Sequence, residues 1–105
     1  MPDRLTTEAF EERYDLPGWR VIEDGVETWW RGGSFTEGGA FAAEVAALAD
    51  AADHHPDLEL RYPGRLHVRL TSHDAGGLTD RDGALARQIS DAAEARGITV
   101  DWDDA

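Results

Sequence analysis

Three of the four histidines of the chain stand beside carboxylates in two short segments that lie far apart in the sequence. His54 and His55 are adjacent and precede Pro56, and His73 precedes Asp74. An imidazole near pH 7 donates or accepts a proton with little penalty, so two or three of them around one pocket suit acid–base catalysis. The two segments are therefore the first candidates for a functional site.

Four carboxylates accompany these histidines, namely Asp50, Asp53, Asp74 and Asp82. Asp82 follows Thr79 by three residues and so occupies the N3 position of a capping box, with Asp in place of the usual Glu. The free N–H groups and the dipole of a helix N-terminus favour an ionised carboxylate there. Two interpretations stay open, in which Asp82 only caps the helix or also holds a catalytic imidazole.

The histidines themselves have other interpretations. His54 and His55 before a proline could simply cap a helix C-terminus, where an imidazolium meets the helix dipole favourably. A metal site that combines one of them with His73 and a carboxylate is a further alternative, although no spaced motif such as H-E-x-x-H supports it. The chain contains no cysteine, which excludes disulfides, thiolate metal sites and a cysteine nucleophile.

Apolar periodicity and capping residues predict the helices that must position these side chains. One short helix is expected over residues 5–13, and a longer one over 36–53 begins behind Ser34. A last helix begins behind Thr79 and ends at Gly97. The apolar stripe expected on the second helix comprises Phe41, Val45, Leu48 and Ala52.

Alternating apolar residues and turn dipeptides predict two hairpins, 19–24 with 26–31 around Asp24-Gly25, and 58–62 with 66–70 around Pro63-Gly64. The order helix, hairpin, helix, hairpin, helix indicates an α+β fold. Its four-stranded antiparallel sheet is covered by helices on one face. Residues 1–105 are expected to form a single domain, with residues 98–105 as a short extra strand or a loose tail.

The charge balance limits the classes of partner. Asp and Glu total 22 against ten basic residues, all arginine, for a net charge of −12. Such a surface repels nucleic-acid backbones and anionic membranes. With no apolar stretch near the roughly 18 residues of a membrane span and no signal peptide, a cytoplasmic protein is expected. Acidic excess without lysine is similar to proteins of halophilic archaea.

One combination of segments resembles a known family. The run from Asp50 to Asp57, Tyr62, the run from Thr71 to Thr79 and Asp82 resemble the signature of the pterin-4a-carbinolamine dehydratases. Gly18-Trp19, Phe35 and Phe41 also fit, and the likeness covers roughly residues 5–96. Two departures are that the family usually has Glu at the place of Asp50, and that the turn Tyr62–Arg65 is one residue longer than usual.

The resemblance implies dehydration of 4a-hydroxytetrahydrobiopterin, or a related pterin, without a metal or organic cofactor. It assigns the acid and base roles to His55 and His73, and lets His54 orient or protonate the substrate. Asp50 and Asp82 would tune the histidines, and pterin-binding residues are expected at Asp50, Asp53, Thr71, Ser72 and Asp74. A homodimer or homotetramer is implied, and a pterin-binding or protein-interaction module without catalysis is the alternative.

The acidic composition gives a prediction about stability. At a net charge of −12, self-repulsion should weaken the compact state when screening is removed. The Debye length falls to about 3 Å at 1 M salt, so the melting temperature should rise steeply between low salt and molar KCl. A melting temperature that does not depend on salt would contradict the halophilic interpretation and leave the enzymatic one intact.

Overall fold

The computed structural model describes residues 4–102, apart from the side chain of His73. Its helices are α1 (Thr7–Arg13), α2 (Phe35–Ala52) and α3 (Asp80–Arg96), and a 3₁₀ turn, η1, covers His73–Ala75. The strands are β1 (Arg20–Ile22), β2 (Gly25–Arg31), β3 (Asp57–Arg61), β4 (Arg65–Leu70) and β5 (Thr99–Val100). No helix in the described part of the chain is long and apolar enough to cross a membrane.

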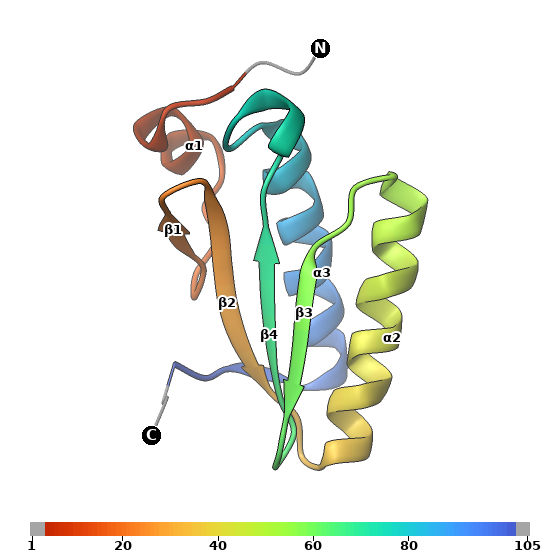
Figure 1. Cartoon of the computed structure of the whole chain (residues 1–105). Coiled ribbons are helices and arrows are strands. Elements are labelled where there is room, and N and C mark those ends of the chain that lie inside the picture. The colour runs from red at the N-terminus through yellow and green to blue at the C-terminus, as the bar shows by residue number, and fades with distance from the viewer. Residues whose placement is uncertain (1–3, 103–105) are drawn as a thin grey trace.

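The strands form one antiparallel sheet in the order β1-β2-β4-β3. α2 and α3 run along one face of this sheet, whereas α1 lies at the end of the sheet beside β1 (Figure 1). The predicted α+β class and helix-covered antiparallel sheet are confirmed. The sheet has five strands where four were predicted for its two hairpins, because β5 pairs with the end of β2 beyond β1. Of the two alternatives for residues 98–105, the short extra strand is the one observed, at Thr99–Val100.

The core lies between the sheet and the two long helices. Leu66, Val68 and Leu70 of β4 are buried there, as the alternation along that strand predicts. On α2 the buried positions are Gly38, Phe41, Val45 and Ala49. The predicted stripe is therefore only partly correct, since Leu48 is half-buried and Ala52 is exposed.

Trp29 and Trp30 lie on opposite faces of β2. Trp30 is buried in the core, with its ring edge-on to Phe41. Trp29 is half-buried on the helix-free face beside His67, and the Arg65 guanidinium lies 4.3 Å from its ring centroid. The helix-free face of the sheet is thus a mixed aromatic and charged surface.

Left-handed residues end both long helices in the same way. Beyond α2, Asp53 has φ 50° and ψ 42°. Its N–H donates to the backbone carbonyl of Asp50, and the N–H of His54 donates to the backbone carbonyl of Ala49. Gly97 repeats this Schellman arrangement beyond α3, which confirms its predicted C′ role. Asp53 takes the place usually given to glycine, and the chain reversal there delivers His54 toward α3.

The first hairpin differs from its prediction by one residue. Glu23 and Asp24 form the loop, and Gly25 already pairs with Ile22. A Cβ atom on Gly25 would lie 2.2 Å from the carbonyl oxygen of Leu70 on β4. This glycine therefore permits a close approach of two backbones, which explains why the Asp24-Gly25 dipeptide does not mark the turn itself.

This close approach predicts that Gly25→Ala destabilises the fold. An inserted methyl group must push β2 away from β4, which should lower the free energy of unfolding by about 1–3 kcal/mol. Gly39→Ala is the matched control, because its Cβ meets only Leu60, at 3.7 Å, and alanine favours a helix by about 0.5–1 kcal/mol. Equal stabilities of the two variants in denaturant unfolding would contradict this explanation.

Candidate active site

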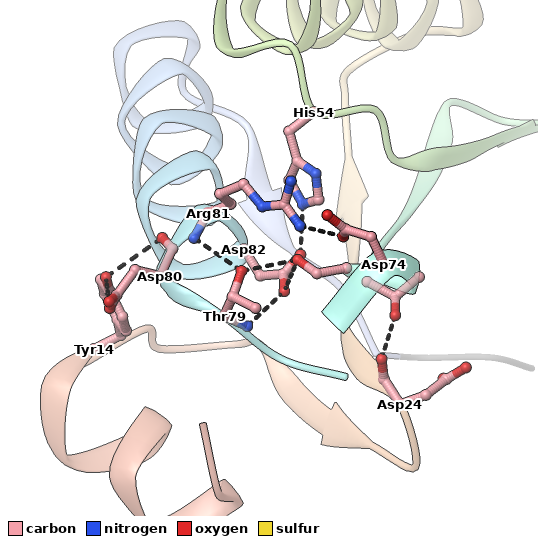
Figure 2. A network of polar contacts seen from close by, with 10 residues as sticks. Tyr14, Asp24, His54, Asp74, Thr79, Asp80, Arg81 and Asp82 are labelled. Atoms are coloured by element: carbon pink, nitrogen blue, oxygen red, sulfur yellow. Dashed lines mark hydrogen bonds and ion pairs between the residues drawn. The ribbon is translucent and has the colours of Figure 1, made fainter. Parts of the chain in front are cut away.

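The carboxylate of Asp82 is fully buried in the first turn of α3, where three elements meet (Figure 2). Its Oδ1 atom lies 2.6 Å from Nε2 of His54, which follows α2. Its Oδ2 atom accepts hydrogen bonds of 2.9 Å from the Ser72 hydroxyl beyond β4 and from the backbone N–H of Thr79. One side chain therefore ties the ends of α2 and β4 to the start of α3.

The hydroxyl groups around Asp82 form a directed chain of donors. An ionised carboxylate only accepts, so Ser72 must donate its proton to Asp82. Thr79 then donates to Ser72 over 2.8 Å and accepts from the backbone N–H of Arg81 over 3.2 Å. The capping box at Thr79 and Asp82 is present as predicted, and the same carboxylate also contacts an imidazole.

The contact with Asp82 determines which nitrogen of His54 carries a proton. The helix N-terminus and two donors on Oδ2 favour the ionised carboxylate, so Nε2 of His54 donates to Oδ1. In the neutral imidazole the lone pair is then on Nδ1, which has no hydrogen-bond partner among the described residues. His54 is only 8% exposed, so this acceptor is held in a fixed orientation.

His55 belongs to a second, exposed pair. Its Nε2 atom lies 2.9 Å from Oδ1 of Asp50 in the last turns of α2, and the two side chains are 60% and 79% exposed. The adjacent histidines thus contact different helices, one inside the protein and one at its surface. The shorter Asp50 side chain still reaches an imidazole.

Asp74 and Arg81 form an ion pair between η1 and the first turn of α3 (Figure 2). The hydrogen bond from the Arg81 guanidinium holds the pKa of Asp74 below its usual range. The sequence interpretation included Asp74 but missed Arg81, because an arginine in a first helical turn has the pattern of an ordinary solvated residue. The predicted binding residue Asp53 is exposed at the end of α2.

Two other predicted binding residues use their side chains within the protein. The hydroxyl of Thr71 donates to the backbone carbonyl of Asp24, and that of Ser72 belongs to the chain around Asp82. The hydroxyl protons of both residues are therefore already used within the protein, and a ligand could meet only their oxygen lone pairs or their backbone groups. His73 lies in η1, but its side chain is outside the described part of the chain, so its catalytic role stays a prediction.

α1 anchors the start of α3 from the other side. Tyr14 donates to Asp80 over 2.6 Å, and Arg13 contacts both oxygens of the same carboxylate at 2.8 and 2.9 Å. Burial, followed by the contact with Asp80, raises the pKa of Tyr14 to about 12. The Tyr14 ring covers Gly83, where a Cβ atom would lie 2.4 Å from it. Sequence reasoning missed this anchor because its partners are far apart in the chain.

A metal site would be an alternative use of the acidic residues. Among the described side chains, no group of three histidines, cysteines or carboxylates could hold a metal ion. The alternative metal site also involves the side chain of His73, which the structure does not describe.

The threefold use of the Asp82 carboxylate predicts that Asp82→Asn destabilises the protein. An amide has one oxygen and cannot accept from His54, Ser72 and Thr79 together, so the free energy of unfolding should fall by about 1–3 kcal/mol. Asp80→Asn changes the same charge two residues earlier, where exposed contacts contribute at most about 1 kcal/mol. Denaturant unfolding that shows equal losses for both variants would contradict the buried network.

Comparisons with known proteins identify the family. The family described as pterin 4 alpha carbinolamine dehydratase matches residues 3–92. A relative from Thermomicrobium roseum, provisionally named pterin-4-alpha-carbinolamine dehydratase, is 44% identical over 79 residues, or 75% of this chain and 84% of that protein. One from Halobacterium salinarum with the same provisional name is 40% identical over 92 residues, covering 87% and 98% of the two chains.

A solved structure shares the fold. The crystal structure described as a transcriptional coactivator/pterin dehydratase from Brucella melitensis has a TM-score of 0.79 and 29% identity, and the match covers 87% of this chain and 99% of that one. Together, the family match over most of the chain and the identities above 30% carry the assignment. This chain belongs to the pterin-4a-carbinolamine dehydratase family.

Proposed function

We propose that this protein dehydrates a 4a-hydroxytetrahydropterin to the quinonoid dihydropterin and water, using the histidines at the junction of α2, β4 and α3. The observation that carries the proposal is the 2.6 Å contact between buried Asp82 and His54. A histidine oriented by a buried carboxylate is a common arrangement for moving protons in enzymes. The family to which the chain belongs is one of dehydratases, which supports the same reaction class.

The reaction requires two proton movements. The bond between C4a and the hydroxyl oxygen breaks, and that oxygen leaves as water once it has received a proton. The proton on N5 is removed, and its electron pair forms the double bond between C4a and N5. The proton taken from N5 balances the proton given to the hydroxyl group, so the protein needs one general base and one general acid.

His54 is the proposed base. Its Nε2–H is committed to Asp82, so Nδ1 offers the lone pair to the proton on N5. When that proton arrives, the imidazolium is stabilised by the carboxylate, and burial strengthens this interaction relative to bulk water. The contact gives His54 a larger role than the sequence suggested, where His55 and His73 were the expected acid–base pair.

His55 or His73 is the proposed acid. His55 is exposed and paired with Asp50, so it can recover a proton from solvent after each turnover. The pterin itself would contact Asp53, Asp74 and the backbone of residues 71–74. The proposed chemistry uses no metal and no organic cofactor. That the protein is cytoplasmic, and that it forms a homodimer or homotetramer, also stay predictions.

A pterin-binding or protein-interaction module without catalysis is the second candidate. The Brucella melitensis protein is described as both a coactivator and a dehydratase, which is the observation that favours this second candidate. Replacing His73 separates the two functions, because an enzyme would lose turnover whereas an interaction module would keep its partner.

The proposal predicts that replacing His54 greatly lowers the dehydration rate, and that replacing a histidine paired with a carboxylate elsewhere in the protein does not. His54→Gln keeps a donor for Asp82 but removes the titrating nitrogen, so stopped-flow dehydration of a synthetic carbinolamine in molar salt should slow by about 10² or more. His67→Gln is the control, since His67 also contacts a carboxylate, Glu27, at 2.7 Å but lies on the helix-free face of the sheet.

Excess chelator should leave the wild-type rate unchanged. Full activity of His54→Gln would contradict the assignment of the base, and equal losses in both histidine variants would indicate a general structural effect. A wild-type protein that does not accelerate the reaction would exclude the enzymatic function and favour the second candidate.

A further inference from the structure

The guanidinium of Arg81 lies at the edge of the candidate site with most of its donors unused. It belongs to the first turn of α3, directly before Asp82, and its contact with Asp74 uses only Nη2 (Figure 2). The Nε–H group is buried and has no acceptor among the described residues. The guanidinium donors other than the one bonded to Asp74 are also without an acceptor among the described residues, and the Arg81 side chain is 36% exposed, so a ligand acceptor can reach it without displacing Asp74.

Arg81 is a positively charged donor among several negatively charged side chains. The described residues at this end of the sheet include several carboxylates, Asp50, Asp53, Asp74, Asp80 and Asp82. Arg13 pairs with Asp80 and Arg69 with Asp24, whereas Arg81 pairs with Asp74 directly beside the turn that carries Asp82. An electron-rich atom of a ligand is therefore attracted to Arg81 and repelled by most of its surroundings.

The ion pair presents a donor beside an acceptor. Arg81 can donate through its unused N–H groups while Nη2 keeps Asp74 in place. The Asp74 side chain is 56% exposed, its hydrogen bond from Arg81 uses only Oδ1, and its lowered pKa keeps it ionised at neutral pH. This combination is complementary to a lactam edge, which is a carbonyl oxygen next to a ring N–H.

We propose that Arg81 and Asp74 recognise the substrate by such a lactam edge. The inference rests on the proposed function, because in a 4a-hydroxytetrahydropterin this edge is formed by the 4-oxo group and N3–H. The 4-oxo carbon is bonded to C4a, so a contact there holds the reacting carbon at a fixed distance from Arg81. Asp82, the next residue in the chain, orients His54. One turn of α3 would then position both the substrate, through Arg81, and the proposed base, through Asp82.

Ligand binding tests this recognition without requiring turnover. The affinities of pterin and of 2,4-diaminopteridine, which differ only at this edge, are compared by quenching of tryptophan fluorescence in molar salt. The diamino compound replaces the 4-oxo acceptor by a donor and N3–H by an acceptor, so wild-type protein should bind the lactam compound at least about tenfold more tightly. Arg81→Gln and Asp74→Asn should each reduce this preference severalfold or more.

Two controls keep the result interpretable. Arg87→Gln removes the same charge from α3, where the guanidinium donates to the backbone carbonyl of Asp15 over 3.4 Å, and should keep wild-type selectivity. Arg81→Lys keeps the charge but not the planar set of donors, and should resemble Arg81→Gln in selectivity. In the dehydration assay, KM should rise more than kcat falls for both Arg81 variants, because the contact orients substrate and moves no proton.

The outcomes distinguish this inference from the proposed function. If wild-type protein turns over and Arg81→Gln keeps its KM and its selectivity, the lactam contact is wrong and the enzymatic function stands. If wild-type protein selects the lactam compound but does not dehydrate the carbinolamine, the proposed function fails and the recognition stands. Equal affinity of wild-type protein for both compounds, or binding of neither, would overturn the inference.

Discussion

The rest of the site depends on the hydrogen bonds that the buried carboxylate of Asp82 accepts. It accepts from the end of α2 through His54, from the end of β4 through Ser72 and from its own helix through Thr79. Leaving any of these donors unpaired inside the protein would cost about 1–3 kcal/mol. The positions of two helices and a strand are thereby coupled to the orientation of one imidazole, so the requirements of folding and of proton transfer coincide at a single residue.

The surroundings of Asp82 are arranged to keep this coupling rigid. The Schellman turn at Asp53 brings His54 to α3, and Tyr14 with Arg13 fixes the first turn of α3 through Asp80. The proposed substrate contacts at Arg81 and Asp74 are more exposed than the pair between His54 and Asp82. The buried pair of His54 and Asp82 orients the base, and the more exposed pair of Arg81 and Asp74 is open to the ligand. Side chains held by packing and hydrogen bonds keep such a site in a fixed geometry.

The sequence was informative where an interaction is local. The capping box joins residues three apart, and Gly97 ends its helix by a conformation that glycine adopts easily, so both were predicted correctly. The contact from His54 to Asp82 spans 28 residues and was considered only as an open alternative, because periodicity does not reveal which loop ends meet. Gly25 was misassigned to a turn since its constraint comes from Leu70, far along the chain. The lactam-binding role proposed for Arg81 depends on donors without an acceptor among the described residues, which a sequence pattern does not reveal.

The orientation of His54 tests the central claim most directly. Nitrogen-15 NMR of the histidine rings, at a pH where they are neutral and with His54→Gln to assign the resonance, reports which nitrogen carries the proton. The described geometry predicts a single tautomer with the proton on Nε2, fixed by Asp82. A proton on Nδ1, or the averaged signal of an imidazole that exchanges freely between tautomers, would contradict the proposed base and the carboxylate that orients it.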